Sequence, residues 1–382
     1  MIFETPNLDD REQDVVERIK ELRQALRRQV AEPLTWVGLL RRVTFARAIR
    51  GSNSIEGINV SLDDAVAAAG DQAPLDAEDE VWAAISGYRN AMTYVLQLAD
   101  DPHFTFDCSL LRSLHYMMMR HDLNKSPGRW RPGETFVRDE ETDEIVYEGP
   151  DFLEVPTLMN ELVGELAGED DHPVSVRAAM AHLNLAMIHP FRDGNGRMAR
   201  CLQTLVLARE GVVAPVFSSI EEYLGRNTES YYAVLAEVGG GRWQPQRDAR
   251  PWVRFVLLAH YRQATTLLRR SAEAQARWDS LAATAQKMGF PDRATFALYH
   301  AALGFRLRSS IYRQHADVSN AIANRDLRAL SEAGLLIPHG ENRGRFYSAS
   351  EELRAIELSI RRDRTPVGDP FEDSPRQPMP AI

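Results

Sequence analysis

The sequence predicts a mainly α-helical protein that carries one β-hairpin among its helices and a small winged helix-turn-helix domain towards its C-terminal end. Apolar residues recur every three or four positions through most of the chain, which is the period of an amphipathic helix. Before residue 288, only the segment GRWRPGETFVRDEETDEIVYEGP has the pattern of paired strands. From about Phe290 the rhythm changes to three short helical patterns followed by a second hairpin pattern.

The first helix is predicted from Val15, Ile19, Leu22 and Leu26, which step by three or four through a charged segment and form one buried stripe. The helix over VSLDDAVAAAG has a serine cap, acidic residues in its first turn and a glycine at its end. The same apolar period predicts further helices over residues 33–48, 78–99, 152–167, 175–188, 201–211, 229–239 and 252–288.

In the predicted hairpin, a run from Thr135 to Arg138 and a run from Ile145 to Tyr147 flank an acidic turn. Pro132 has no backbone N–H to donate, which suits strands at the edge of a sheet. We therefore expect residues 1–110 to form an N-terminal helical region and residues 111–288 to form a helical core that carries the hairpin.

Residues 289–350 have the element order of a winged helix, in which the third helix often enters the major groove of DNA. Ser319 caps that third helix, Gly334 ends it, and GENRG turns between two short strands. Residues 290–348 contain eight arginines and five acids, a balance of +3 within a chain of net charge −10. The candidates for contact with DNA phosphates are Arg325, Arg328, Arg343 and Arg345.

Composition narrows the class of protein. A chain of 382 residues, 44% of them hydrophobic, can bury a large core, and its net charge of −10 argues against non-specific wrapping of nucleic acid by the whole chain. No run of eighteen apolar residues and no apolar signal core occur, so neither membrane insertion nor export is predicted. Cys108 and Cys201 have no CxxC spacing and predict free thiols in the cytoplasm. The proline-rich residues 365–382 are predicted to form a disordered tail.

The segment HPFRDGNGRMAR, residues 189–200, breaks a helical pattern. Proline inside a helix costs about 3 kcal/mol and each glycine about 1 kcal/mol relative to alanine, so the break needs a local reason. Gly194 and Gly196 free the backbone to point successive N–H groups at one spot, and the helix that starts there adds its positive end. Arg197 and Arg200 share one face of its first turn and offer forked donors to phosphate oxygens.

An acid and an imidazole complete this set. Asp193 at the rim would repel phosphate unless Mg²⁺ lay between them, so Asp193 is the predicted metal ligand. His189 can take a proton from an incoming hydroxyl near neutral pH. The two glycines alone would equally suit a tight turn, and the segment has neither the Rossmann nor the P-loop pattern. His182 has no HExxH pattern and no third ligand, so it is interpreted as a packed histidine.

HPFRDGNGRMAR resembles the signature of the Fic family, HxFx(D/E)GNGRxxR, with every fixed position present. GRWR before the hairpin, HPVSVRAAMAHLNLAMI before the motif and SYYAVL after it extend the resemblance over about residues 35–258. The resemblance implies a Fic-type helical domain in which the hairpin is a flap. It also implies transfer of AMP from ATP, with Mg²⁺, to a Ser, Thr or Tyr hydroxyl of a target protein, which can be the chain itself.

Carried over by position, the resemblance makes His189 the general base, Asp193 the Mg²⁺ ligand and Arg200 the ligand of the γ-phosphate. It places Phe191 in the core as the anchor of the loop. Gly194, Asn195, Gly196 and Arg197 form the phosphate nest. The predicted catalytic set is His189, Asp193, Asn195, Arg197 and Arg200. Further nucleotide contacts are implied for the flap residues Thr135, Phe136, Val137 and Arg138, and for the aromatic pair Tyr231 and Tyr232, which follow a longer loop at FSSIEEYLGRN.

Upstream, SNSIEG fits the inhibitory pattern of the family, with Ser52, Glu56 and Gly57 at the fixed positions. By itself this segment would equally suit a plain helix terminus. In the family the glutamate pairs with the second arginine of the motif, so that Arg200 is not free for the γ-phosphate. A carboxylate at that place also repels the triphosphate.

The sequence leaves other interpretations open. A Fic-based transcription regulator or nucleotide sensor would bind DNA through residues 290–348, whereas winged helices also serve protein contacts and homodimers. In some relatives the inhibitory glutamate helps to hydrolyse AMP off the target, which would make the enzyme bifunctional. Other relatives take different diphosphate-containing donors, but the intact nest and Arg200 favour ATP.

Overall fold

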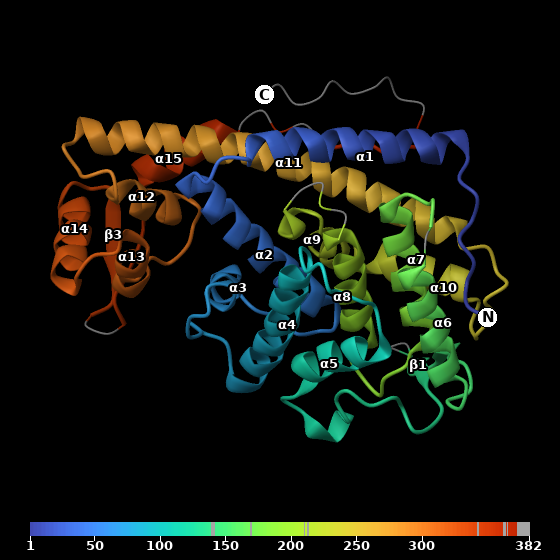
Figure 1. Ribbon diagram of the computed structural model, residues 1–382. Coiled ribbons are helices and arrows are strands. Elements are labelled where there is room, and N and C mark those ends of the chain that lie inside the picture. Colours follow the sequence, from blue (N-terminus) through green and yellow to red (C-terminus); the bar gives the residue numbers. More distant parts are fainter. Residues whose placement is uncertain are drawn as a thin grey trace. The chain divides into compact units, whose positions relative to one another are not determined.

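The computed structural model describes residues 1–138, 142–168, 170–209, 211, 214–341, 344–361, 364 and 366–372. The described chain is mainly α-helical, and its strands form two separate antiparallel hairpins, so the predicted fold class is confirmed (Figure 1). Each helix in this part of the chain is too short or too polar to span a bilayer. Cys108 and Cys201 are both free thiols.

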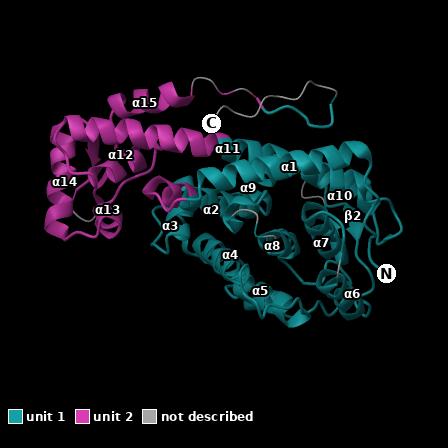
Figure 2. Cartoon of the chain, turned by 45° about the horizontal axis from the view of Figure 1, so that its top comes forward, with its two compact units in different colours: residues 1–31, 41–268, 367–381 teal, residues 32–40, 269–366, 382 magenta. Residues whose placement is uncertain are grey.

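The chain forms two compact units (Figure 2). The first comprises residues 1–31, 41–268 and 367–381, and the second comprises residues 32–40, 269–366 and 382. The long helix α11, Arg250–Lys287, contributes to both because the division falls after Leu268. The division expected from the sequence, after residues 110 and 288, stays a prediction.

The centre of the first unit is formed by α7 and α8, which are buried over nearly their whole length and pack on each other. α4 packs beside α8, and α6 packs beside α7. Trp252 of α11 is fully buried and donates its indole N–H to the carbonyl of Ala179 on α7, at 2.7 Å. Besides α11, the helices and 3-10 turns of this unit are, in chain order, α1 Asp10–Gln29, α2 Thr35–Ile55, α3 Leu62–Ala69, α4 Asp79–Leu98, α5 Cys108–Met119, the 3-10 turn η1 Leu123–Lys125, α6 Val155–Ala167, α7 Val174–Ile188, α8 Asn195–Ala208, the 3-10 turn η2 Pro215–Phe217, α9 Glu221–Arg226 and α10 Thr228–Gly239.

The end of α2 lies further along the chain than the sequence predicts. The apolar period ends at about Ala48, yet the helix continues to Ile55 through the SNSI segment. Asn53 and Ser54 bond back to carbonyls of the preceding turn, at 2.8 and 2.9 Å, and so continue the helix instead of capping a new one. The inhibitory pattern therefore lies on the last turn of a long helix.

The flap hairpin pairs β1, Phe136–Arg138, with β2, Ile145–Glu148. β1 begins one residue after the predicted start at Thr135, and turn residues 139–141 lie outside the described part of the chain. On its other side, Glu148 of β2 exchanges hydrogen bonds with the segment 241–243, at 3.0 and 2.9 Å. Among the described residues β1 has no second strand partner, so β1 is the open edge of the hairpin.

The second unit has the predicted order of three short helices followed by a hairpin. Ser319 caps the third helix by accepting from the Ile322 amide at 3.3 Å, and Gly334 follows the helix with a φ of +76°. Leu307 adds an antiparallel bridge to Tyr347 of the hairpin. Asn342 and Arg343 of the predicted turn lie outside the described residues. The elements are the second part of α11, α12 Ala294–Ala302, α13 Ser309–Ala316, α14 Asn320–Glu332, β3 Leu336–His339, β4 Phe346–Ala349 and the additional helix α15 Glu351–Arg361.

Residues 366–372, within the predicted disordered tail, contact the first unit. Pro370 is buried and its carbonyl accepts from Arg18 of α1 at 3.4 Å. The guanidinium of Arg254 lies 5.9 Å from the ring centre of Phe371. Thr365 and residues 373–382 of the predicted tail lie outside the described part of the chain.

Candidate active site

The loop between α7 and α8 reverses the chain through two left-handed residues. His189 ends α7 with φ +52° and ψ +56°, and its amide bonds to the Leu185 carbonyl at 3.0 Å. Gly194 precedes α8 with φ +76°. A left-handed conformation is unfavourable for histidine, and Pro190 after it disfavours continuation of the helix, so the surrounding contacts must hold this turn.

Asn195 closes the loop from inside. Its side chain donates to the Phe191 carbonyl at 2.9 Å and accepts from the Phe191 amide at 2.8 Å. Phe191 is fully buried, as predicted, and stacks on the ring of His115 at 3.7 Å. The Nδ1 of His115 accepts from the Gly128 amide at 2.8 Å, so its Nε2–H donates to the Asp193 carbonyl at 2.9 Å. His115 holds the loop from α5, and no motif in the sequence singles it out.

The first turn of α8 presents backbone amides to this loop. Gly194 provides no side-chain cap, and the first bond within the helix runs from the Met198 amide to the Gly194 carbonyl at 2.9 Å. The amides of Asn195, Gly196 and Arg197 therefore point out of the helix end, where the helix dipole favours an anion.

Arg197 is a buried cation that makes no ion pair within the described part of the chain. Its side chain is 4% exposed, and its Nη2 contacts the sulfur of Met119 at 3.1 Å. The Nε and Nη1 nitrogens have no hydrogen-bond partner, although both are buried. Burial lowers the pKa of Arg197 and outweighs the nearby charges of Glu56 and Asp193, which raise it. Buried donors without partners are rare in folded proteins, and this pair fits a missing phosphate oxygen.

Asp193 is an ionised carboxylate at the rim of the loop. Its Oδ1 accepts from the Gly194 amide at 2.6 Å, and its Oδ2 lies 3.1 Å from the ammonium of Lys125. Burial opposes ionisation, but Lys125 and the amide outweigh it, and the pKa of Asp193 lies below its usual range. The described residues contain no cluster of three metal-ligating side chains. One carboxylate facing a cation still fits Mg²⁺, which commonly takes its other ligands from substrate phosphates and water.

His189 is neutral at physiological pH in this environment. Burial lowers its pKa to about 4, and the nearby charge of Arg131 contributes. Its Nδ1 lies 3.3 Å from the Ala186 carbonyl, which assigns the proton to Nδ1 and leaves the Nε2 lone pair free to accept a proton. Arg131 donates to the His189 carbonyl at 2.9 Å and to the carbonyl of Pro150 after the flap. The GRWR segment thus ties the base of the flap to the loop.

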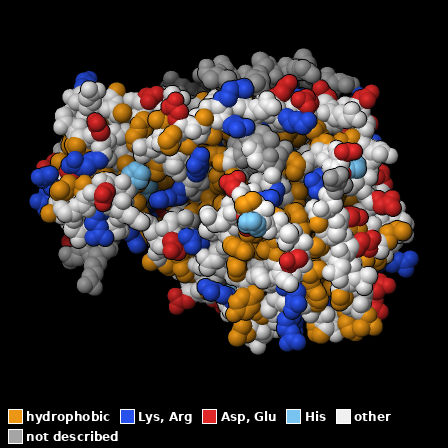
Figure 3. All heavy atoms as spheres, viewed as in Figure 1, with side chains coloured by type: hydrophobic (Ala, Val, Ile, Leu, Met, Phe, Trp, Pro, Cys, Tyr) orange, Lys and Arg blue, Asp and Glu red, His pale blue; other side chains and the backbone are white. Residues whose placement is uncertain are grey.

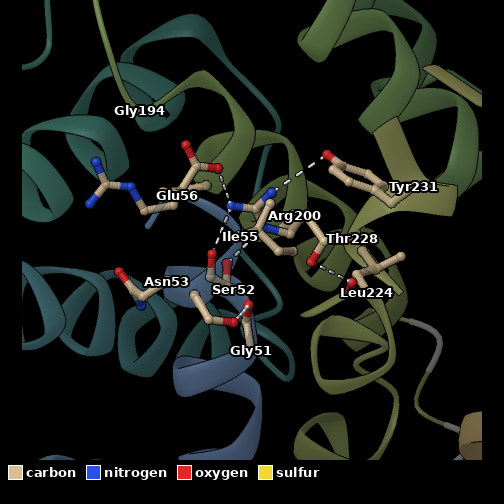
Figure 4. A network of polar contacts seen from close by, with 12 residues as sticks. Gly51, Ser52, Asn53, Ile55, Glu56, Gly194, Arg200, Leu224, Thr228 and Tyr231 are labelled. Carbon is tan, nitrogen blue, oxygen red and sulfur yellow. Dashed lines mark hydrogen bonds and ion pairs between the residues drawn. The ribbon is translucent and has the colours of Figure 1, made fainter. Parts of the chain in front are cut away.

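The end of α2 contacts the second arginine of the motif (Figure 4). Arg200 is 1% exposed, and it donates from Nε to the Ser52 hydroxyl at 2.7 Å and from Nη2 to the Ser52 carbonyl at 3.0 Å. Nη2 also lies 2.5 Å from a carboxylate oxygen of Glu56. Burial alone would lower the pKa of Arg200, but Glu56 outweighs it and the pKa lies above its usual range. Ser52, Glu56 and Arg200 are therefore brought together.

Two glycines make this contact sterically feasible. Gly57 ends α2 with φ +74°, a conformation that disfavours other residues. Gly196 faces the glutamate, and a Cβ atom there would lie 2.5 Å from the Glu56 carboxylate. The carboxylate thus lies against the amide-bearing turn of α8.

The two residues of the predicted aromatic pair, Tyr231 and Tyr232, have different surroundings. Tyr231 is 1% exposed, and its hydroxyl lies 3.5 Å from Arg200 Nη1 and 3.0 Å from His182 Nε2. Tyr232 is 47% exposed and donates its hydroxyl to the Ile55 carbonyl at 3.2 Å. His182 is buried, as expected for a packed histidine. Tyr231 therefore lies beside Arg200, with no ring face exposed to an adenine.

The predicted flap residues Thr135 to Arg138 make contacts within the hairpin and at its base. Phe136 is 44% exposed, and Arg138 donates to the carbonyl of Asp143 across the hairpin at 2.7 Å. Thr135 packs against Gly149, where a Cβ atom would lie 2.8 Å from its methyl group. No hydrogen bond among the described residues joins Val137 or its neighbours on β1 to the α8 turn.

Comparison with known proteins agrees with this geometry. Residues 105–207, which include α5, the flap, α7, the loop and most of α8, match the Fic/DOC family. This part of the chain is therefore similar to a Fic domain. The chain is 28% identical over 255 residues to a protein adenylyltransferase Fic of Nematostella vectensis, a match that covers 66% of this chain and 55% of that protein. It is 42% identical over 83 residues to the protein adenylyltransferase fic-1 of Caenorhabditis elegans, covering 21% of this chain and 13% of that protein. The chain thus spans about half the length of the first of these relatives, and less of the second.

Solved structures of other Fic proteins share the fold. A Fic family protein from Desulfovibrio desulfuricans superposes with a TM-score of 0.57 at 24% identity, covering 91% of this chain and 98% of that one. A Fic domain containing signaling protein from Bacteroides thetaiotaomicron gives a TM-score of 0.52 at 21% identity, covering 69% and 98%. The similarity to these proteins therefore extends beyond the motif to the fold.

Proposed function

We propose that this Fic domain transfers AMP from ATP to a Ser, Thr or Tyr hydroxyl of a target protein, which can be the chain itself. The observation that carries the proposal is an anion site beside a base. Arg197 is buried with two unpartnered nitrogens, and neutral His189 lies at the other end of the same loop. Relatives named protein adenylyltransferase support this reaction.

The reaction is a displacement at the α-phosphorus of ATP. The target hydroxyl oxygen forms a bond to that phosphorus while the bond to the oxygen bridging the β-phosphate breaks, and pyrophosphate leaves. His189 Nε2 takes the hydroxyl proton, and the negative charge of the bound triphosphate raises the pKa of His189 above its value in the free protein. The α8 amides and Arg197 stabilise charge on the phosphate oxygens, which is the main source of acceleration in such transfers.

Asp193 is the residue that would hold Mg²⁺. When bound, Mg²⁺ neutralises charge on the phosphate oxygens. Asp193 suits this task because its carboxylate stays ionised. A Mg²⁺ on Oδ2 would take the place of the ammonium of Lys125, which lies 3.1 Å from that oxygen. The Gly194 amide fixes the other oxygen and orients the carboxylate.

The open edge of β1 would receive the target. β2 is bonded to segment 241–243, which leaves β1 as the strand that an extended target segment can pair with. Main-chain pairing positions a hydroxyl without demanding much sequence, and the exposed ring of Phe136 adds an apolar contact.

Glu56 would restrain the reaction. Its carboxylate already holds Arg200 at 2.5 Å and lies against Gly196 at the start of α8. Arg200 is then not available to the γ-phosphate, and the negative charge disfavours a triphosphate at this place. Full activity would require the end of α2 to move or Glu56 to be removed.

Intact-mass measurement of the Glu56→Gly variant after incubation with ATP and Mg²⁺ tests the proposal. We expect a gain equal to one AMP on the chain or on an added target, and no gain when His189→Ala is combined with it. Absence of label from α-labelled ATP in the Glu56→Gly protein and its targets would contradict AMP transfer. Loss of the added AMP on incubation with wild-type protein would identify a bifunctional enzyme.

The second unit supports a second candidate function, binding of duplex DNA. Asn324, Arg325 and Arg328 are exposed on α14, while its one inward acid, Asp326, is paired with Arg293 at 2.7 Å. Lys and Arg side chains are visible on the surface of this unit in Figure 3. Arginine and asparagine suit contacts to phosphates and base edges, and α14 is the third helix of the predicted winged helix.

Fluorescence anisotropy with a random duplex tests this second function. We expect binding at low salt that weakens by at least about tenfold between roughly 50 and 200 mM salt. The double variant Arg325→Ala/Arg328→Ala should weaken it, whereas Arg354→Ala on α15, another exposed arginine, serves as the control. No binding at low salt would dismiss a DNA-binding regulator and leave protein contact or dimerisation for this unit.

A further inference from the structure

The guanidinium of Arg200 is held from two sides (Figure 4). On one side Ser52 and Glu56, both on the end of α2, take Nε and Nη2. On the other side Nη1 faces the hydroxyl of Tyr231 on α10 at 3.5 Å. If the end of α2 withdraws, Tyr231 is the one hydrogen-bond partner within the described structure that stays with Arg200.

Tyr231 is the first member of a buried network. Its hydroxyl lies 3.0 Å from Nε2 of His182 on α7, and Nδ1 of His182 lies 2.5 Å from the side-chain oxygen of Gln203 on α8. All four side chains are at most 2% exposed. Gln203 follows Arg200 by one turn of the same helix, so the network starts and ends on α8 and braces it against α7 and α10.

The hydrogen bonds of this network all run in one direction, from Arg200 as the donor at one end to Gln203 as the final acceptor at the other. Burial lowers the pKa of His182 to about 3, so its ring carries a single N–H at neutral pH. The Gln203 oxygen can only accept, which places that N–H on Nδ1 and makes Nε2 the acceptor of the Tyr231 hydroxyl proton. The Tyr231 oxygen then offers its lone pairs to Arg200. The reverse direction would give the Tyr231 oxygen two donors and leave its own hydrogen unpartnered.

We propose that Tyr231 and His182 are positioning residues, which hold Arg200 in place for the γ-phosphate of ATP after Glu56 has left and thereby set a preference for ATP over ADP. This proposal rests on the proposed function, in which Arg200 binds the γ-phosphate. It gives Tyr231 a different task from the adenosine contact that the resemblance implies, because the ring is 1% exposed and its hydroxyl is directed into the network. Aligned hydrogen bonds that end on a buried cation strengthen one another.

Calorimetric titration with Mg-ATP and with Mg-ADP tests the proposal. The reference protein is Glu56→Gly/His189→Ala, which frees Arg200 and removes turnover. Adding Tyr231→Phe should weaken ATP binding by about fivefold to tenfold, the effect of one typical hydrogen bond, with ADP changed less than about twofold. Adding His182→Leu should act in the same direction. Tyr223→Phe is the matched control. The hydroxyl of Tyr223 lies 3.3 Å from Arg262 and makes no contact with Arg200 within the described structure.

Equal loss of ATP and ADP binding in Tyr231→Phe would overturn the proposal, since it would indicate an adenosine contact or a packing defect. A double-mutant cycle with Arg200→Ala separates the remaining cases. Arg200→Ala should itself remove the ATP preference, and Tyr231→Phe should then have no further effect. If Tyr231→Phe still weakened ATP binding in Arg200→Ala, it would act elsewhere and the positioning role would be wrong. If Arg200→Ala left the ATP preference intact, the γ-phosphate role of Arg200 in the proposed function would fail as well.

Discussion

Arg197 and Arg200 lie one turn apart on α8, are both buried, and have opposite surroundings. Two nitrogens of Arg197 have no hydrogen-bond partner, whereas all three nitrogens of Arg200 have partners, including a carboxylate oxygen at 2.5 Å. Buried donors without a partner in the described structure mark a place that a ligand can complete. A buried cation paired by its own chain marks a place where that ligand must compete. One half of the phosphate site is thus open and the other half is occupied.

The difference arises from what each arginine faces. The end of α2 reaches Arg200 with both a hydroxyl and a carboxylate, while Arg197 faces the thioether of Met119, a weak acceptor. The two halves of the site can therefore be perturbed separately, and the following experiments do so in order of decreasing expected effect.

The proposed function makes both arginines ligands of the phosphates and gives proton transfer to His189. In the Glu56→Gly protein, His189→Ala should lower AMP transfer by at least about 10²-fold, because the general base is lost. Mg-ATP binding should stay within about twofold, since no phosphate donor is removed. Single-turnover transfer and equilibrium binding measure the two quantities. Transfer above a tenth of the starting rate would show that another group takes the proton.

Removal of the Glu56 carboxylate should make Arg200 available to a phosphate, as Arg197 already is. Glu56→Gly should raise AMP transfer by about tenfold or more, which corresponds to roughly 1.4 kcal/mol or more of restraint. Glu56→Gln keeps the size and a hydrogen bond but removes the charge, so it should fall between wild type and Glu56→Gly. Label transfer from α-labelled ATP compares the three proteins. Equal rates would mean that the Glu56 contact does not limit the reaction.

The position of the inhibitory helix end depends on a contact between two glycines. A Cβ atom on Gly225 of α9 would lie 2.6 Å from the backbone of Gly51 on α2. Gly225→Ala should push the end of α2 from Arg200 and raise transfer by about threefold, a partial release. Gly164→Ala on α6, where a Cβ atom meets nothing within 4 Å, is the matched control. An increase that persists in the Glu56→Gly background would show that α9 acts by another route.

The α8 side of the site contains three neutral histidines, of which His115 and His182 are buried and His189 is half-buried. Burial lowers the pKa to about 4 for His115 and His189 and to about 3 for His182. Between about pH 6.5 and pH 4 the unfolded chain binds protons that the folded chain does not, so stability should fall as the pH falls through this window. Each histidine contributes at most about 1.4 kcal/mol per pH unit.

Urea unfolding at pH 5 and pH 7 measures this loss of stability. His189→Ala should reduce the difference between the two pH values, because one of the three histidines no longer contributes. The same unfolding free energy at both pH values in the wild-type protein would show that these histidines are charged or solvated in the folded state.

Much of the fold and of the loop follows from local patterns. Apolar spacing predicts most helices of the first unit, and the order of elements in residues 289–350 is found as expected. α2 is longer than predicted. The side chains of Asn53 and Ser54 donate hydrogen bonds to carbonyls of the preceding turn, and an apolar period does not register such bonds. In the tail, the carbonyl of Pro370 accepts from Arg18, a contact between distant residues that composition does not predict, while disorder of residues 365–382 stays a prediction.

The sequence by itself determined the local chemistry: where α7 ends, where the backbone can turn through glycine, and that two arginines start one helix on the same face. Only the tertiary structure decided which partner each side chain has. Glu56 meets Arg200 across 144 positions, a pair that the family resemblance implies but that no spacing predicts. His115 reaches the Asp193 carbonyl across 78 positions, and neither a pattern nor the resemblance implies this contact. Lys125 lies beside Asp193, and Tyr231 beside Arg200, for the same reason. Burial and hydrogen bonding between distant residues depend on how helices pack, and the spacing of residues within one helix does not contain that information.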